Sequence, residues 1–161
     1  MQAEVTPVIA KEQTLEAIIS VDGASKGNPG PAGAGVVIAA PQGPVLQEIS
    51  VPIPHATNNV AEYTGLLKGL QAARELGLKR IEVRTDSELM VRQLSGEYRV
   101  KNPGLRRLYL QVAQLMSRFE WCRVRHVGRE SNLAADQLAT AAARQAAKAG
   151  KKEPSQRSLD L

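Results

Sequence analysis

The amino-acid sequence predicts an α/β fold in which helices cover both faces of a mixed β-sheet. Two observations support this prediction. Three strand-like segments follow one another near the start, and from residue 59 onward helical segments alternate with two further strands. The resulting order is β-β-β-α-β-α-α-β-α. A meander followed by helical crossovers gives a sheet with both antiparallel and parallel neighbours.

The first predicted strand, residues 15–22 (LEAIISVD), is rich in β-branched residues and ends at an Asp-Gly turn signal. The next segment, 23–33, reads GASKGNPGPAG, and its Gly and Pro content predicts irregular structure. Strands follow at about 33–40 and 45–53. Because the Pro-Gln-Gly-Pro connection between them is short, we expect these two strands to form an antiparallel hairpin.

Helical spacing starts at Asn59, where apolar residues recur every three or four positions, and Gly77 gives a stop signal. The run 80–85 (RIEVRT) alternates as a strand. A short helix at about 87–95 follows and ends at a Ser-Gly pair. Pro103 is well suited to the first turn of the next helix, which carries a stripe of Leu and Val residues.

The last strand and helix complete one predicted domain. Residues 119–127 (FEWCRVRHV) alternate as a strand, and residues 132–147 form an Ala-rich helix. We therefore expect a domain over residues 15–147. Residues 1–14 are expected to be a flexible leader, and the basic, Pro-containing tail 148–161 is expected to be disordered.

The composition is that of a globular protein that we expect to be cytoplasmic and monomeric. No apolar run approaches the ~20 residues that a membrane span needs, so we expect no membrane partner. The single cysteine, Cys122, excludes an internal disulfide and fits a reducing compartment.

Positive charge is concentrated in one part of the chain. The whole sequence carries a formal net charge of +5, whereas residues 92–129 contain nine basic and two acidic side chains, a net of +7. A basic segment beside acidic residues suits a polyanion that is cut with the help of metal ions. Solvated helix and strand faces would explain the same charges, so basicity alone does not decide.

Four acidic residues lie in short signatures where a strand is expected to end or a helix to begin. They are Asp22 in VDGASKGNPGP, Glu62 in TNNVAE, Asp86 in TDSE and Asp136 in NLAADQLA. Carboxylates that converge without a cation repel one another, and divalent metal relieves that repulsion.

Each of the four acids also has a structural alternative. Asp22 could serve only an Asp-Gly turn, and Glu62 could complete a capping box with Asn59. Asp86 could be the N-cap of the helix that follows it. Asp136 lies in the first turns of a helix, where an acid is favourable in any case.

Taken together, in this order, the four motifs resemble the active-site set of ribonuclease H type 1, and the resemblance covers residues 15–143. It implies a ribonuclease H-like fold with a five-stranded mixed sheet whose second strand is antiparallel to its neighbours. Between residues 96 and 105 the chain lacks the extra basic helix and loop of the best-known members. The resemblance is therefore to the handle-less subgroup.

The resemblance also implies a reaction: endonucleolytic hydrolysis of the RNA strand of an RNA–DNA hybrid, leaving 3′-hydroxyl and 5′-phosphate ends. Two Mg²⁺ ions, for which Mn²⁺ could substitute, would take part. Asp22 would bridge both ions, Glu62 and Asp86 would hold one, and Asp136 would hold the other. His126, or Arg129 in its place, would assist turnover, and the sequence leaves open which of them does so.

Other matched positions imply contacts with the substrate. Asn28, Asn58 and Asn59 would contact the RNA strand, where 2′-hydroxyls distinguish RNA from DNA, and Thr57 would seat a DNA phosphate. Turn and capping chemistry is the alternative for these residues. In the absence of a handle, affinity would depend on basic residues such as Arg99 and Lys101, and binding would be strongly salt-dependent.

Two other functions remain open: a non-catalytic module that binds RNA or hybrids, and a different nuclease on the same fold. The intact acidic quartet argues against the first, because a binder does not need that repulsion beside an anionic substrate. The three asparagines argue against the second. The preference among hybrid, double-stranded RNA and single ribonucleotides in DNA is not decided by the sequence.

Overall fold

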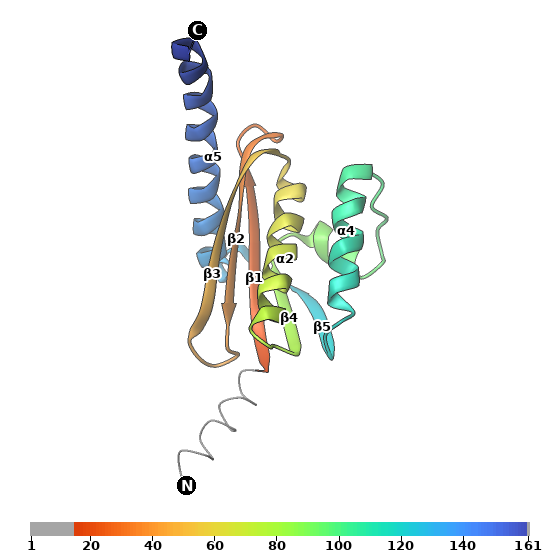
Figure 1. The fold of residues 1–161 in the computed structure, drawn as a ribbon. Coiled ribbons are helices and arrows are strands. Elements are labelled where there is room, and N and C mark those ends of the chain that lie inside the picture. Colours follow the sequence, from red (N-terminus) through yellow and green to blue (C-terminus); the bar gives the residue numbers. More distant parts are fainter. Residues whose placement is uncertain (1–14, 161) are drawn as a thin grey trace.

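The computed structural model describes residues 15–160, and their side chains up to residue 151 (Figure 1). The expected leader, residues 1–14, therefore lies outside the described residues. The elements are β1 (Glu16–Ser25), β2 (Gly30–Ala39), β3 (Val45–Ala56), α2 (Asn58–Glu75), β4 (Arg80–Thr85), α3 (Glu88–Leu94), α4 (Pro103–Met116), β5 (Trp121–His126), the 3₁₀ turn η1 (Arg129–Ser131) and α5 (Leu133–Asp160).

The five strands form one mixed sheet in the order β3-β2-β1-β4-β5. The pairs β1–β2 and β2–β3 are antiparallel, whereas β1–β4 and β4–β5 are parallel. The predicted fold class is confirmed, including the hairpin of β2 and β3 and the antiparallel placement of β2. No helix in the described part of the chain is both long enough and apolar enough to cross a bilayer.

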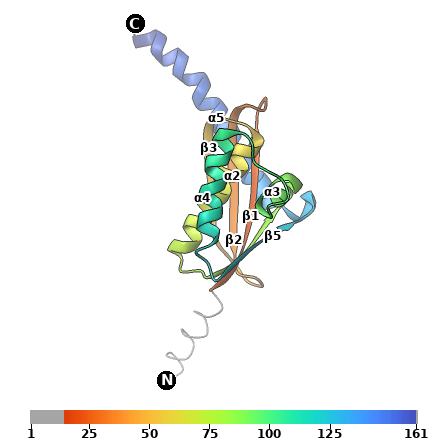
Figure 2. The ribbon, with the colours of Figure 1, turned by 90° about the vertical axis from the view of Figure 1, so that its right-hand side faces the viewer.

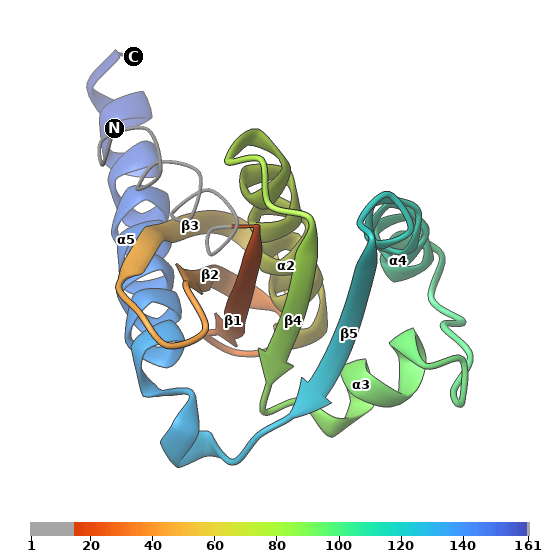
Figure 3. The ribbon, with the colours of Figure 1, turned by 90° about the horizontal axis from the view of Figure 1, so that it is seen from below.

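Helices lie on both faces of the sheet (Figure 3). Helix α2 covers one face, with α4 beside it and α3 near β4 and β5, and α5 covers the other face over β1, β2 and β3. Figure 2 shows α4 in front of α2, with α3 beside β5. The main core lies under α2, where Leu66 and Leu70 pack with Ile19 and Val83.

Glycines let both helices approach the central strands closely. A Cβ at Gly65 of α2 would lie 2.9 Å from the Ala34 methyl group of β2. On the other face, a Cβ at Gly35 of β2 would overlap the carbonyl oxygen of Ala135 and lie 2.6 Å from the Ala139 nitrogen, both in α5. Larger side chains at these positions would push the helices away from the sheet.

The prediction of an irregular segment from residue 23 to 33 was wrong. Strand β1 continues past Asp22 to Ser25, and β2 begins at Gly30. Regular antiparallel pairing runs through this segment to the pair Ser25 and Ala32, so its backbone groups bond across the hairpin. Small residues are tolerated there because helices cover both sides. Within residues 23–33, positive φ angles occur only in the tight turn, at Gly27 and Asn28.

The final helix is longer than predicted. We expected it to end at residue 147 and residues 148–161 to be disordered, but α5 continues to Asp160. The prediction of disorder relied on polarity and a proline. It gave too little weight to the Ala, Gln, Arg and Lys residues of this stretch, all of which have high helix propensity.

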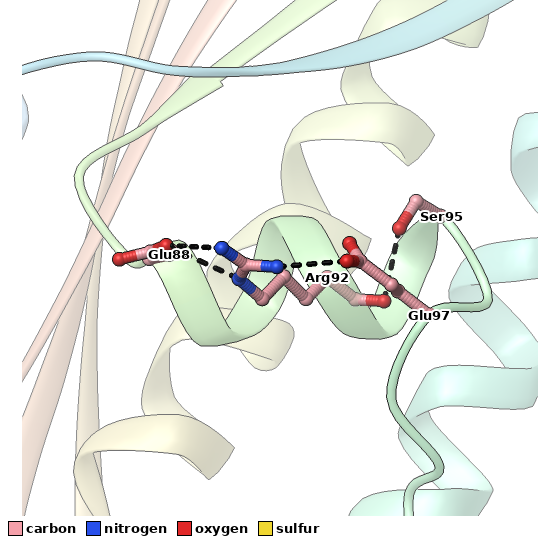
Figure 4. Close-up of polar contacts among 4 residues, drawn as sticks. All are labelled: Glu88, Arg92, Ser95 and Glu97. Carbon is pink, nitrogen blue, oxygen red and sulfur yellow. Dashed lines mark hydrogen bonds and ion pairs between the residues drawn. The ribbon is translucent and has the colours of Figure 1, made fainter.

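An ionic clamp fixes α3 to the turn that follows it (Figure 4). Arg92 donates two hydrogen bonds to one Glu88 oxygen (2.7 and 3.1 Å) and one to Glu97 (2.8 Å). The Arg92 carbonyl accepts hydrogen bonds from Ser95 Oγ and from the Glu97 and Tyr98 amides. The clamp ties the start of the connection between α3 and α4 to the helix.

The close approach of α5 can be tested with two glycine-to-alanine variants. Gly35→Ala is expected to lower the free energy of unfolding by about 1–3 kcal/mol, because the new methyl group overlaps α5 backbone atoms. Gly150→Ala is the control. Gly150 lies in α5 itself, and a Cβ at this position would meet nothing within 4 Å. Urea denaturation measures both. Equal stability of the two variants would show that α5 does not depend on this contact.

Candidate active site

Four carboxylates from four different elements line one hollow. The hollow has a volume of about 280 Å³, and its lining includes Asp22 of β1, Glu62 of α2, Asp86 after β4 and Asp136 of α5. Arg129 lines it as well. The structure therefore brings together all four acids that the sequence analysis selected.

Asp22 lies within β1 rather than at its end, which corrects the expectation from the Asp-Gly signal. The parallel ladder between β1 and β4 nevertheless stops at the pair Ser20 and Arg84, so Asp22 lies beyond it, where the two strands separate. Its antiparallel partner is Gly35, which faces α5, so the Asp22 side chain points to the same side. Asp22 is only 7% exposed.

Glu62 reaches the strand from the opposite face. A Cβ at Gly23 would lie 2.6 Å from the Glu62 backbone nitrogen, so only glycine lets α2 approach the strand at this point. The N-cap of α2 is Thr57, which accepts a hydrogen bond from the Val60 amide (3.2 Å). The alternative of a capping box with Asn59 is therefore excluded. Glu62 is 8% exposed, and its Oε2 has no hydrogen-bond partner.

Asp86 and Asp136 lie at the ends of elements. Asp86 directly follows β4, and the N-cap of α3 is Ser87, whose hydroxyl accepts a hydrogen bond from the Met90 amide (3.2 Å). The alternative that Asp86 caps α3 is therefore excluded as well. Asp136 lies in the first turn of α5, as its position in the sequence predicted. Both carboxylates are half-buried.

Burial and mutual repulsion keep these carboxyl groups from ionising readily. Burial, the nearby charge of Asp86 and a hydrogen bond with Asp136 together raise the pKa of Asp22 to about 8, with burial the largest cause. Burial also raises the pKa of Glu62 to about 7, although a hydrogen bond with Ser87 acts in the opposite direction. The site concentrates negative charge that its own residues do not neutralise.

The donor set suits a hard divalent cation. All four side chains offer carboxylate oxygens, and the buried, unpartnered Oε2 of Glu62 is a free ligand atom. Among the described residues, no three His, Cys, Asp or Glu side chains are already close enough to hold one ion together. Repulsion spreads like charges apart, so we expect the carboxylates to draw together only around a cation.

Asn132 is a site residue that the sequence analysis did not select. It is 2% exposed, and its Nδ2 donates a hydrogen bond to the Val21 carbonyl (3.0 Å) where β1 has lost β4 as a partner. Its own carbonyl accepts a hydrogen bond from the Asp136 amide (3.0 Å). Asn132 therefore connects the strand that carries Asp22 to the helix that carries Asp136. Its position four residues before Asp136, at the start of the NLAADQLA motif, is the sequence signal that could have identified it.

The expected substrate-contacting residues form a neighbouring hollow of about 370 Å³. Its lining is Asn28, Thr57, Asn58, Asn59, Val60, Asn102 and Leu105. Asn58 also lines the carboxylate hollow, so the two hollows adjoin. The Asn58 amide donates a hydrogen bond to Asn28 Oδ1 (2.9 Å). Asn102, the N-cap of α4, was not foreseen.

The structure places the two candidate turnover residues differently. Arg129 lines the carboxylate hollow. His126, the exposed last residue of β5, is not part of that lining; its positive form contributes to the lowered pKa of Glu88, after the larger effect of Arg92. Arg99 and Lys101 lie in the connection before α4 and line neither hollow, although Lys101 is exposed beside Asn102.

Comparison with known proteins gives consistent matches. A family model described as reverse transcriptase-like matches residues 20–142. The bifunctional protein Rv2228c of Mycobacterium tuberculosis is 46% identical over 126 residues, which cover 78% of this chain but 35% of the relative. The chain thus spans about a third of the length of the first curated relatives it matches. The ribonuclease HI of Halobacterium salinarum is 38% identical over 86% of this chain and 70% of its own length.

Solved structures agree. The N-terminal RNase H domain of Rv2228c superposes with a TM-score of 0.81 at 44% identity, covering 83% of this chain and 97% of that one. LC11-RNase H1, solved in complex with an RNA/DNA hybrid, gives a TM-score of 0.75 at 42% identity and covers 81% and 98%.

The raised pKa values predict a stability that falls with pH when no metal is present. The pKa values of Asp22 and Glu62 rise from 3.8 and 4.5 to about 8 and about 7 on folding, so their contribution is complete below pH ~4 and is lost as the pH rises through 7 and 8. Asp22→Asn removes one buried charge and is expected to raise the free energy of unfolding at pH 8 by about 1–3 kcal/mol.

Urea denaturation at pH 5 and pH 8, in the presence of a chelator, measures this effect. The exposed acid Glu75 at the end of α2 provides the control, and Glu75→Gln should leave the pH dependence as it is. An Asp22→Asn protein that loses as much stability between the two pH values as the unaltered chain would contradict the prediction.

Asn132→Ala leaves the Val21 carbonyl without its donor and is expected to cost about 1–3 kcal/mol of unfolding free energy. Gln137→Ala, at an exposed position one turn further along α5, is the matched control and should be nearly neutral. Thermal unfolding of both variants provides the measurement. Equal melting temperatures would show that this hydrogen bond does not hold the strand and the helix together.

Proposed function

Because the chain belongs to the ribonuclease H type 1 family, we propose that it is an endonuclease that hydrolyses the RNA strand of RNA–DNA hybrids, leaving 3′-hydroxyl and 5′-phosphate ends. The observation that carries this proposal is the gathering of Asp22, Glu62, Asp86 and Asp136 around one hollow. We place the domain at residues 15–147, in the handle-less subgroup.

The residues fit a pair of Mg²⁺ ions, with Mn²⁺ as a substitute. Asp22 would bridge the two, Glu62 and Asp86 would hold one, and Asp136 would hold the other. Bound there, the ions would activate a water molecule and neutralise the leaving oxygen of an in-line displacement. The chain's own part is to supply carboxylates whose high pKa values reflect their burial and their repulsion by Asp86.

Arg129 is better placed than His126 to contact the reacting phosphate, since it lines the carboxylate hollow. A guanidinium stays protonated, so Arg129 would act by holding a phosphate oxygen rather than by moving a proton. His126 remains exposed at the end of β5, outside the lining of this hollow.

The neighbouring hollow would position the RNA strand next to these groups. Asn28, Asn58 and Asn59 offer amide groups to 2′-hydroxyls, and Thr57 would seat a phosphate of the DNA strand. Arg99 and Lys101 would add phosphate contacts beyond it. We propose that the protein is a monomer that acts in the cytoplasm.

Asp86→Asn tests the metal assignment. It removes one ligand charge and is expected to reduce cleavage of a hybrid at least about 100-fold while the fold stays intact, because a single electrostatic group in such a site is worth about 10²–10³-fold. Glu75→Gln is the matched control, an acid far from the hollow. Cleavage is measured on labelled hybrid, duplex RNA and duplex DNA, with Mg²⁺ or a chelator.

An Asp86→Asn protein as active as Glu75→Gln would contradict the assignment. Retention of hybrid in a gel without metal-dependent cleavage by the unaltered chain would indicate a binding module instead.

A further inference from the structure

One face of β4 and β5 is not covered by a helix in the described part of the chain. Helix α5 packs on β1, β2 and β3, and Figure 3 shows it on the far side of the sheet from β5. The residues Ile81, Val83 and Thr85 of β4 are buried toward the other helices, so the alternate residues point to the uncovered face.

Six side chains form this surface, which we name the arginine face. The parallel register sets them side by side in the pairs Arg80 and Trp121, Glu82 and Arg123, and Arg84 and Arg125. Arg80 pairs with Glu120 (3.1 Å), and Arg84 and Arg123 share Glu82 (2.7 and 4.0 Å). Four arginines against two glutamates leave the surface positive, and Arg125 is exposed without an ion pair among the described residues.

The arginine face also offers planar groups for stacking. The Arg123 guanidinium lies 4.2 Å from the centre of the Trp121 ring, and the Arg123 side chain is 68% exposed. Trp121 is the single tryptophan of the chain and is itself half-buried. Aromatic and guanidinium planes on a flat sheet are the groups on which unpaired bases stack, while neighbouring arginines bind the phosphates.

The arginine face runs directly to the carboxylate hollow. Arg84 precedes Asp86 by two residues, and Arg125 precedes Arg129 by four, so the positive end of the face opens onto the proposed cleavage centre. From Arg125 to Trp121 the face extends along the strands for about 13 Å at the usual rise of a strand. A nucleic-acid strand leaving the hollow could follow this track without crossing α5.

We propose that the arginine face binds a single-stranded extension of the substrate, an unpaired tail that continues from the hybrid held at the carboxylate hollow. A tail is favoured over more duplex because the bases of a duplex are already stacked and would gain nothing from Trp121 and Arg123. This inference rests on the proposed function, but cleavage of a blunt hybrid does not depend on it.

The single tryptophan makes the test direct. Asp86→Asn protein, which should bind without cutting, is titrated with a blunt hybrid and with the same hybrid carrying an unpaired tail at each strand end in turn. One tailed hybrid is expected to bind about five- to tenfold more tightly than the blunt one, the lower end of what stacking of one base provides, and to quench Trp121 fluorescence. Equal affinity and unchanged fluorescence for every tail would overturn the proposal.

Two further substitutions in the same background locate the contact. Arg125→Gln and Trp121→Ala should each remove most of the gain from the tail, measured by anisotropy of a labelled hybrid, and leave blunt-hybrid affinity unchanged. Arg118→Gln, an exposed arginine at the end of α4, is the control and should keep the gain. If Arg118→Gln also lost the gain in affinity from the tail, the gain would come from the overall positive charge of the protein, and the proposal would be overturned.

Two other outcomes are informative. Equal quenching by a polyglutamate peptide at the same salt would assign the surface to acidic protein segments instead. Failure of the unaltered chain to cut a blunt hybrid would refute the proposed function. The tail experiments measure binding alone, so their failure would refute the inference about the arginine face and not the proposed function.

Discussion

The burial of carboxylates without a counter-charge is the constraint on which the site depends. Asp22 and Glu62 are almost inaccessible, and one oxygen of Glu62 has no partner. Taking an ionised carboxylate out of water is costly unless it is paired or coordinated. A fold that retains this arrangement gives up stability in the metal-free state, and it gathers hard oxygen ligands of the kind that divalent cations prefer.

The backbone around β1 brings those carboxylates together from both faces of the sheet. Gly23 admits α2 on one side, and Gly35 admits α5 on the other. Between them, β1 parts from β4 just before Asp22, and Asn132 takes over the hydrogen bond that the lost strand partner would have made. Two glycines and an asparagine, residue types that carry little information in a sequence, thus determine where the acids of distant elements meet.

This arrangement explains what the sequence could and could not predict. Hydrophobic spacing and composition located the five strands and the α-helices, although not the 3₁₀ turn η1, and the four acidic motifs identified the carboxylates. The continuation of β1 beyond Asp22 could not be predicted from the sequence, because this Gly-rich segment becomes a strand only through its pairing with β2. Likewise, local spacing allowed Asn59 or Asp86 as caps, and only the three-dimensional path of the chain selects Thr57 and Ser87.

The separation of charge within the fold follows from the same geometry. Residues 92–129 carry a net charge of +7, yet only Arg129 of this segment lines the carboxylate hollow. If more arginines entered the hollow, they would neutralise the carboxylates and remove the reason to bind metal. Positive groups instead occupy surfaces at its margin, where they can attract a polyanion without competing for the ligand oxygens. The uncovered face of β4 and β5 is one such margin, since its register places arginines in line with the hollow but outside it.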